Sequence, residues 1–308
     1  MIITRLLGGL GNQMFQYAAG LALAEQHRTV LKLDIGWFRH YAEYEPHNRY
    51  SLNCFNVTEQ FATKQEIDYL RGKALTTVER CSEAVARRLR FYNYADNLQS
   101  HGSYYSAKSF RFDPDFWRQP DNAYLEGMWQ SEKFFLPIAN LLRLHFSFRY
   151  RPQPRVAEFK ARIASGPSAF VHFRRGDYVR NTNFNREIGI LPLDYYYRAV
   201  EMVRAHCPDV TLYVYSDDIE SIRREFHPPG PHVFVDVVEN WHAYDKMRLM
   251  SWCNHAVISN STFAWWAAWL NPSPNKIVIG PDPWFSGKEY DSNDLLPEYW
   301  IRLPARTG

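Results

Sequence analysis

The chain has 308 residues, of which 46% are hydrophobic and 22% are charged, a composition typical of globular proteins that excludes a disordered chain. Its formal net charge of +3 is too small to indicate nucleic-acid binding, so we expect no nucleic-acid partner. The sequence lacks an uninterrupted apolar stretch of about 18 residues, and no transmembrane helix is predicted.

The cysteines and the N-terminal residues indicate the compartment. Four cysteines are scattered without the spacing of a metal site, which favours free buried thiols and a reducing environment. The apolar run at residues 1–7 lacks the long apolar core of a signal peptide. We therefore expect a cytoplasmic protein. The basic segment 80–90 is typical of a solvated helix face, and its alternative role would be peripheral contact with anionic lipid at the inner face of the membrane.

The first 35 residues predict a strand, a glycine loop, a helix and a second strand. These segments are residues 1–7, 8–13, 14–26 and 29–33, in that order. Apolar residues recur at helical spacing in the third segment, and a strand–helix–strand start implies a parallel sheet with a right-handed crossover. The pattern is less regular as far as residue 150, with helices expected at residues 64–71, 80–90 and 132–148, the last interrupted near Pro137.

Two prolines mark the expected domain boundary. The run Arg151-Pro152-Gln153-Pro154 should block regular structure, and it predicts domains at residues 1–150 and 151–308. In the second domain, strands are predicted at residues 169–173, 210–215, 232–237, 256–259 and 276–279, and helices at residues 193–205, 219–226, 244–253 and 262–270. Such alternation indicates a doubly wound α/β structure, and two halves of this kind imply a cleft between them.

Two adjacent arginines, Arg174 and Arg175, follow the predicted strand at residues 169–173. In an open parallel sheet, ligands bind outside the carboxyl ends of the strands. The guanidinium group presents a planar fork of donors that matches phosphate or carboxylate oxygens. Asp177 lies two residues further on and would hold one of the arginines. The pattern predicts a site for a polyanionic ligand, with a surface ion pair as the equally open alternative.

The glycine loop offers a second place for an anion. Gly9 and Gly11 stand between a predicted strand and a helix, where backbone amides can approach a ligand at the helix N-terminus. Asp34, at the end of the next strand, would hold ribose hydroxyls in a dinucleotide-binding fold. However, Met14 replaces the third glycine of that motif. Asn12 and Gln13 add amide groups that suit a sugar or a phosphate.

Polar residues also follow two later strands. They are Ser216, Asp217 and Asp218 after one strand, and Asn260, Ser261 and Thr262 after another. Hydroxyls and amides at a helix N-terminus can form an anion site, and simple N-capping is the alternative. Because these groups and the arginine pair share one edge of the predicted sheet, together they favour a nucleoside diphosphate there.

Other patterns carry less weight. The pair Asp113 and Asp115 matches a metal-binding D-x-D pattern but lies beside a proline in an irregular segment, which favours a turn. The histidines lack zinc-binding spacing. Since the arginines can neutralise a diphosphate, we expect neither a metal ion nor another cofactor. The three tryptophans at positions 265, 266 and 269 have helical spacing and indicate core packing rather than a sugar platform.

Five segments together resemble one enzyme family. The two hallmark motifs of the bacterial type of α1,2-fucosyltransferase are similar to residues 8–18 (Gly-Gly-Leu-Gly-Asn-Gln-Met-Phe-Gln-Tyr-Ala) and 172–178 (His-Phe-Arg-Arg-Gly-Asp-Tyr). Residues 213–218 and 258–266 match two more motifs in the same order, and residues 129–135 resemble a further family segment. The likeness runs from residue 1 to about residue 280.

The resemblance implies a GT-B architecture, with an N-terminal Rossmann-like domain on the acceptor side and a C-terminal one on the donor side. It also implies inverting, metal-independent transfer of L-fucose from GDP-β-L-fucose to the 2-hydroxyl of a β-galactoside. By resemblance, Arg174 grips the β-phosphate, Asn12 faces the donor, and Asp217, Ser261 and Thr262 contact guanine, ribose or phosphate. We expect Arg175 to support Arg174 and Asp177 to orient an arginine or the acceptor. His172 would act in catalysis or hold guanine.

Two alternatives come from other functional classes. A nicotinamide-dependent oxidoreductase would use Gly9, Gly11 and Asp34. A non-catalytic nucleotide- or glycan-binding module would use the aromatic residues, which make up 16% of the chain.

Overall fold

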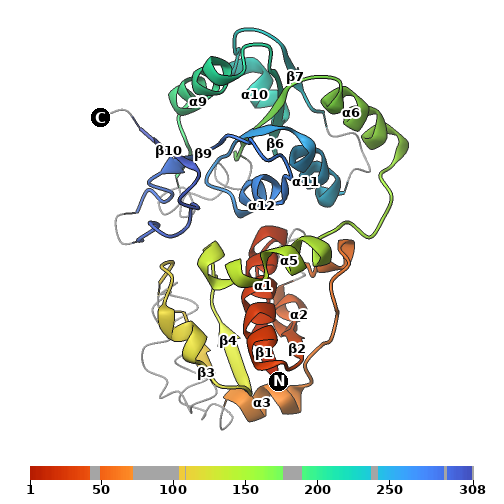
Figure 1. Ribbon diagram of the computed structural model, residues 1–308, viewed down its shortest axis with the longest axis vertical. Helices are drawn as coiled ribbons and strands as arrows, with labels where there is room; N and C mark the ends of the chain where they lie inside the picture. Colours follow the sequence, from red (N-terminus) through yellow and green to blue (C-terminus); the bar gives the residue numbers. More distant parts are fainter. Residues whose placement is uncertain are drawn as a thin grey trace. The chain divides into compact units, whose positions relative to one another are not determined.

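The computed structural model divides into two compact units, Met1–Ser147 and Phe148–Gly308. It describes residues 1–41, 49–71, 104–107, 109–175, 189–236, 242–287 and 290–306. The division falls close to the boundary expected after residue 150. Each unit is an α/β structure with its own all-parallel sheet, which confirms the predicted fold class (Figure 1).

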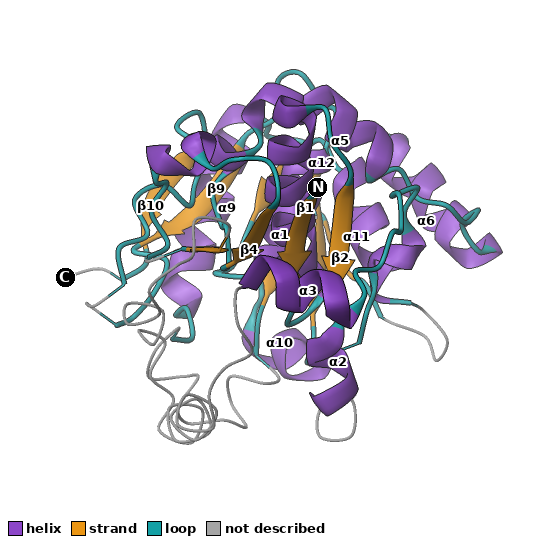
Figure 2. Cartoon of the chain, turned by 90° about the horizontal axis from the view of Figure 1, so that it is seen from below, coloured by secondary structure: helices purple, strands orange, loops and turns teal. Residues whose placement is uncertain are grey.

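The N-terminal unit has a four-stranded sheet in the order β2-β1-β4-β3. Its strands are β1 (Ile2–Arg5), β2 (Leu31–Asp34), β3 (Tyr104–Ser106) and β4 (Ala123–Glu126). Figure 2 shows β2, β1 and β4 side by side. The helices are α1 (Leu10–His27), α2 (Gly36–Tyr41), α3 (Lys64–Arg71) and α5 (Ala139–His145), with 3-10 turns at η1 (Leu52–Cys54), η3 (Pro114–Arg118), η4 (Glu132–Phe134) and η5 (Leu136–Ile138). The helix expected at residues 132–148 is thus three short elements.

Helix α1 packs closely on its sheet because of Gly20, not because of a glycine near its start. A Cβ atom at Gly20 would lie 2.8 Å from Leu31 Cδ1 and 3.0 Å from Thr4 Cβ, on the two strands that the helix connects. Met14, in the place of the third motif glycine, is fully buried in the core. Close helix–sheet contact is therefore compatible with methionine at that position.

The C-terminal unit has six parallel strands in the order β7-β6-β5-β8-β9-β10. They are β5 (Ser168–Phe173), β6 (Thr211–Ser216), β7 (His232–Phe234), β8 (His255–Val257), β9 (Val278–Asp282) and β10 (Ile301–Pro304). Counted within the unit, this is the order 3-2-1-4-5-6 of a Rossmann fold. The order reverses between β5 and β8, so the topological switch point lies between these two strands.

The helices of this unit are α6 (Pro154–Ala164), α9 (Leu193–His206), α10 (Ile219–Glu225), α11 (Ala243–Trp252) and α12 (Thr262–Leu270). Pro154 begins α6, so the expectation that both prolines block regular structure was wrong. Proline is tolerated at the first helical position because the N–H it lacks would have no partner there. The three tryptophans of α12 are buried, which confirms their assignment to the core.

Other expectations concern thiols and membrane contact. Cys54 and Cys253 are buried, as expected, but Cys207 is only half-buried, contrary to expectation. Cys81 and the basic segment 80–90 lie outside the described residues. In the part of the chain that the structure describes, no helix has the length and apolar character needed to cross a bilayer.

Candidate functional site

The switch point of the C-terminal unit joins β5 to the segment after β8 through a buried histidine. The Nδ1 atom of His172 lies 2.8 Å from Ser259 Oγ, and His172 is only 7% exposed. Burial lowers the pKa of His172, the negative charge of Asp217 raises it, and the positive charges of Arg174 and Lys246 lower it, with a net value of about 3. The imidazole is therefore neutral at physiological pH and acts as a hydrogen-bonding group.

Asp217 organises the arginine motif. It follows β6, whose last residue, Ser216, pairs in register with Phe173. Its Oδ2 atom lies 2.9 Å from Arg174 Nη1, and its Oδ1 atom accepts a 2.7 Å hydrogen bond from the Arg175 backbone N–H. The Arg174 side chain is 30% exposed and that of Asp217 24% exposed, so both can still reach a ligand.

The neighbours of Asp217 have structural partners. Asp218 caps α10 by accepting a 3.2 Å hydrogen bond from the Ser221 N–H, as the capping alternative predicted. Ser216 Oγ accepts a 3.0 Å bond from the Asp218 N–H. Arg175 Nη2 lies 3.7 Å from Glu225 on α10. Of the two aspartates, only Asp217 is aligned with the arginine motif.

Lys246 is a further cation at this edge that the sequence did not indicate. It lies in the first turn of α11, which connects β7 to β8 and therefore starts at the carboxyl edge of the sheet. Burial lowers the pKa of its ammonium group. The negative charge of Asp217 raises this pKa, and the positive charge of Arg174 lowers it. Within the described residues its ammonium forms no ion pair. A single lysine inside a helix carries no sequence signal, because only the fold brings it beside the arginine motif.

The N-terminus of α12 completes the switch point. Ser261 stands at the N-cap position, but its side chain makes no capping hydrogen bond, and the first turn, which opens with Thr262, has no acidic residue. The backbone N–H groups there retain their positive potential. Asn260 is buried, and its Nδ2 atom donates a 2.9 Å hydrogen bond to the Gly189 carbonyl, so it shapes the turn before the helix.

The predicted glycine loop lies at the carboxyl edge of the N-terminal sheet, but only Gly8 and Gly9 precede the helix, because α1 begins at Leu10 rather than at Met14. Gly9 is the N-cap of α1, and Gly11 is buried inside the helix. Asn12 Oδ1 accepts a 3.1 Å hydrogen bond from Gln130 Nε2, which follows β4. Gly8 has a φ of +73°, and a Cβ atom there would lie 2.7 Å from Asn12 Nδ2. Glycine at this position therefore allows the turn and leaves room for the Asn12 amide.

Gln13 is buried and bound to the backbone on both sides of its amide. Its Nε2 atom donates 2.8 Å hydrogen bonds to the carbonyls of Gly8 and Arg49. Its Oε1 atom accepts a 2.9 Å bond from the Ser51 N–H. These contacts attach residues 49–51 to the glycine loop and give Gln13 a structural part beside the ligand contact predicted for it.

Asp34 has protein partners where a dinucleotide-binding fold would place ribose. Its Oδ2 atom accepts a 2.6 Å hydrogen bond from the Tyr124 hydroxyl, and Oδ1 accepts a 2.8 Å bond from the Gly36 N–H. The residue is only 8% exposed. This environment does not favour the nicotinamide alternative.

The D-x-D segment is a turn, as expected. Asp113 caps η3 by accepting a 2.9 Å hydrogen bond from the Asp115 N–H, and it also accepts a 2.6 Å bond from the Tyr105 hydroxyl. No cluster of three or more His, Cys, Asp or Glu side chains suited to a metal ion occurs among the described residues. The absence of a metal from the reaction stays a prediction.

The structure thus brings His172, Arg174, Asp217 and the start of α12 to one edge of the C-terminal sheet, together with Lys246 and Ser259. The predicted glycine-loop residues belong to the other unit. Asp177 lies outside the described residues. What remains is an anion site with three features: a neutral histidine, two cations beside one carboxylate, and an uncapped helix N-terminus.

Comparison with known proteins agrees with this chemistry. The model of the family described as "Glycosyl transferase family 11" matches residues 1–301. An alpha-1,2-colitosyltransferase of Escherichia coli is 30% identical over 98% of this chain and 99% of its own. The O-antigen biosynthesis glycosyltransferase WbnK of the same species is 29% identical over 97% of this chain and 99% of its own. A galactoside alpha-(1,2)-fucosyltransferase 1 of Sus scrofa is 29% identical over 50% of this chain and 46% of its own.

Solved structures show a more distant likeness. The structure of NodZ alpha-1,6-fucosyltransferase soaked with GDP-fucose has a TM-score of 0.49 and 15% identity, over 92% of this chain and 94% of that one. This likeness is too remote to bear on function. The family match over nearly the whole chain confirms the resemblance drawn from the motifs. The chain is an enzyme that belongs to glycosyl transferase family 11.

Proposed function

We propose that this enzyme transfers L-fucose from GDP-β-L-fucose to the 2-hydroxyl of a terminal β-galactoside, with inversion at the anomeric carbon and without a metal ion. The observation that carries the proposal is the convergence of Arg174, Lys246 and the uncapped N-terminus of α12 at the switch point of the C-terminal sheet. Ligands of open parallel sheets bind at such a point. The galactoside acceptor is supported by the names of the mammalian relatives.

The balance of charge at this site suits a diphosphate. Each phosphate of a GDP-sugar carries one negative charge, whereas Arg174 is already paired with Asp217 at 2.9 Å. That pair alone has no net charge to offer. Lys246 supplies the missing positive charge, and the α12 N-terminus adds a partial one. These groups can neutralise the donor without a metal.

The reaction breaks the bond between the anomeric carbon and the β-phosphate oxygen and forms one to the acceptor oxygen, while the acceptor hydroxyl loses its proton. Negative charge builds on the departing GDP in the transition state. Arg174 and Lys246 would stabilise that charge more than they stabilise the ground state. The preformed contacts of Asp217 with Arg174 and Arg175 support this role, because they hold the guanidinium group ready.

His172 is assigned to donor binding rather than to proton transfer. A pKa of about 3 makes its neutral imidazole a poor base. Its Nδ1 atom is engaged by Ser259, which leaves Nε2 for the donor nucleotide. Asp177 would orient an arginine or the acceptor.

The decisive experiment is incubation with GDP-fucose and a panel of β-galactosides, followed by NMR of the product. We expect an α-fucosyl group on the 2-hydroxyl of galactose and release of GDP only when acceptor is present. A 1,3 or 1,6 linkage, or a β-anomeric product, would overturn the proposal. Release of GDP without any glycoside product would show that the protein only hydrolyses the donor.

A second donor is favoured by one specific observation. The full-length relative at 30% identity is named as a colitosyltransferase, and colitose is fucose without its 3-hydroxyl. The same diphosphate site would serve GDP-colitose. Comparing kcat/KM for the two donors with one acceptor decides between them. A site that hydrogen-bonds the 3-hydroxyl of fucose would discriminate strongly against colitose.

A further inference from the structure

The first turn of α11, which carries Lys246, has no side-chain cap. His242 stands at the N-cap position but makes no capping hydrogen bond. Helix ends of this kind fray readily, because their first N–H groups lack partners within the helix. Helix α11 packs against α12 and α6 (Figure 1). A lysine that meets a diphosphate needs a fixed helix start, so other contacts are required to hold this turn in place.

A buried ion pair begins in this turn. Arg248 Nη1 lies 3.0 Å from Asp245 Oδ1, and both side chains are only 2% exposed. Among the described residues, Asp245 Oδ2 is the only carboxylate oxygen that is buried without a hydrogen-bond partner. The attraction between two buried charges often fails to offset the cost of removing them from water. The pair therefore calls for a role other than stability.

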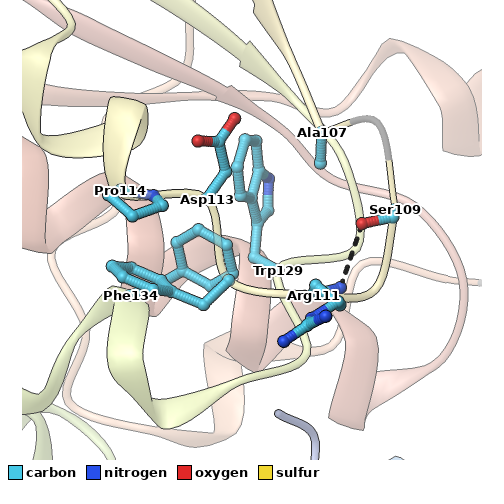
Figure 3. Close-up of a pocket in the computed structure, with 8 residues that line it drawn as sticks. Ala107, Ser109, Arg111, Asp113, Pro114, Trp129 and Phe134 are labelled. Carbon is cyan, nitrogen blue, oxygen red and sulfur yellow. Dashed lines mark hydrogen bonds between the residues drawn. The ribbon is translucent and has the colours of Figure 1, made fainter. Parts of the chain in front are cut away.

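The unpartnered oxygen of Asp245 differs in charge from other buried atoms that lack a partner. Among the same residues, the indole nitrogen of Trp129 is also buried without one, in the wall of the aromatic pocket of the N-terminal unit (Figure 3). That nitrogen is a neutral donor, and leaving it unpaired costs less than leaving a charged oxygen unpaired. Asp245 thus depends on the guanidinium group of Arg248 for its buried charge.

Arg248 also binds the first residues of the C-terminal unit. Its Nη2 atom donates a hydrogen bond to the Tyr150 carbonyl. Its Cζ atom lies 4.6 Å from the centre of the Phe148 ring. The centre of the Tyr244 ring, in the first turn of α11, lies 5.8 Å from the same atom and 6.2 Å from the centre of the Tyr150 ring. One guanidinium group thus ties residues 148–150, where the unit begins, to the start of α11.

Arg248 and Lys246 project from different sides of α11. Successive residues of an α-helix are rotated by about 100°, so residues two positions apart are rotated by about 200°. Lys246 is half-buried at the carboxyl edge of the sheet, whereas Arg248 is enclosed by protein. Arg248 can therefore influence a ligand at Lys246 only through the helix that carries both residues.

We propose that Arg248 is a positioning residue for Lys246. By joining Asp245 to residues 148–150, it fixes the first turn of α11 so that the Lys246 ammonium meets the diphosphate. The inference rests on the proposed donor site. Arginine suits this part because its planar fork of donors can bind a carboxylate and a carbonyl at once, whereas a lysine ammonium is a point charge.

A double-mutant cycle in the full-length enzyme tests the proposal. Arg248→Lys keeps a positive charge beside Asp245 but removes the fork of donors. Lys246→Met removes the charge that meets the diphosphate. Arg204→Lys is the matched control, because Arg204 also donates hydrogen bonds to two backbone carbonyls, but from α9. Calorimetry gives the Kd for GDP and for guanosine in the wild type, the three single variants and the double variant of Arg248 and Lys246.

We expect Arg248→Lys to raise the Kd for GDP about fivefold, less than the roughly tenfold effect of removing the Lys246 charge itself. Guanosine, which has no phosphates, should bind as it does to the wild type. In the Lys246→Met background, Arg248→Lys should change the Kd for GDP less than about twofold, because the residue that it positions is gone. Arg204→Lys should match the wild type.

Unchanged GDP binding in Arg248→Lys would overturn the proposal. So would an equal effect with and without Lys246, or an equal effect on GDP and guanosine, since either indicates a general loss of structure. If Arg248→Lys does not fold, Phe148→Leu, which removes the ring beside the guanidinium group, should show the same dependence on Lys246.

The same measurements separate this proposal from the proposed function. Unchanged GDP binding in Lys246→Met would refute the charge assigned to Lys246 in the donor site, and this proposal with it. Weaker GDP binding in Lys246→Met but not in Arg248→Lys or Phe148→Leu would overturn the positioning role alone. Because GDP is the probe, neither result depends on which sugar the enzyme transfers.

Discussion

Arg174 Nη1 lies 2.9 Å from Asp217 Oδ2, and the other oxygen of the same carboxylate accepts a 2.7 Å hydrogen bond from the Arg175 N–H. One aspartate at the end of β6 thus fixes both the side chain and the backbone of the motif at the end of β5. Such preorganisation lowers the cost of aligning a cation with a developing charge.

Arg174→Ala should lower kcat roughly 10²-fold or more, the scale observed when one preorganised donor to a transition-state charge is removed. Steady-state kinetics with saturating GDP-fucose would measure this. Arg198→Ala is a matched control, because Arg198 also pairs with an aspartate, Asp194, at 2.7 Å but lies on α9. Activity of Arg174→Ala within a few-fold of the wild type would contradict the assignment.

Lys246→Met should weaken GDP binding about tenfold, since it removes the charge that the Arg174–Asp217 pair does not supply. Binding of guanosine, which lacks phosphates, should change little. Calorimetry with both ligands measures the difference. Lys160→Met makes the same charge change on α6, where Lys160 contacts the Trp252 ring, and should bind GDP as the wild type does. An equal effect of Lys246→Met on guanosine would point to misfolding rather than to phosphate contact.

The burial of His172 predicts a pH dependence of stability. Its pKa in the folded protein is about 3, below the value of about 6.5 of an unfolded histidine. At pH values between these two pKa values, His172 therefore binds a proton in the unfolded chain but not in the folded one. The burial of His172 does not lower the free energy of unfolding above about pH 6.5. As the pH falls from 6.5 toward 3, that free energy decreases by about 1.4 kcal/mol per pH unit.

Urea denaturation of the wild type and of His172→Gln between pH 4 and pH 8 tests this. The variant should lose less stability on acidification than the wild type. In assigned NMR spectra the His172 ring should not titrate between pH 5 and pH 8. A midpoint near pH 6.5 would return His172 to consideration as a proton acceptor.

Gly20→Ala should destabilise the N-terminal unit by roughly 1–3 kcal/mol, the usual cost of overpacking a core. The added methyl group would meet Leu31 and Thr4 at 2.8 and 3.0 Å. Gly166→Ala is the comparison, because a Cβ atom there meets nothing within 4 Å. Urea midpoints of the two variants should separate clearly. Equal midpoints would mean that α1 can shift outward without penalty.

Removal of divalent ions should leave fucosyl transfer intact. The arginine, the lysine and the helix N-terminus provide the positive charge that a metal would otherwise bring. Turnover is measured after dialysis against EDTA and again after adding Mg²⁺ or Mn²⁺. Activity that disappears with EDTA and returns with either ion would refute metal-independent transfer.

The sequence predicted most of the C-terminal unit because its strands alternate with helices of clear periodicity. It did not predict β3, β4 or β10, which are as short as β7 and β8 but, unlike them, are not followed by a helix of clear periodicity. Because β4 was not predicted, the sequence did not show that it pairs with β1 in the N-terminal sheet or that Trp129 follows it.

Some candidate site residues could likewise be predicted from the sequence, and others could not. The sequence could place Arg174 and Asp217 at one sheet edge because each directly follows a recognisable strand. Lys246 was missed because only the crossover through α11 brings it to the same edge. From the sequence, Ser261 could either belong to an anion site or cap α12 with its side chain. In the structure its side chain makes no capping hydrogen bond. Asp34 stands where a dinucleotide-binding fold has its ribose ligand, but its hydrogen bond from Tyr124 depends on β4, which could not be predicted from the sequence.

The strand order of the C-terminal unit has a consequence for synthesis of the protein. His172 on β5 meets Ser259 after β8, although 87 positions separate them along the chain. A ribosome that has released β5, β6 and β7 has therefore made the arginine motif and Asp217, but not the strand and helix that close the opposite side of the nucleotide site. Nascent chains should remain unable to retain GDP until α12, which ends at Leu270, has left the exit tunnel.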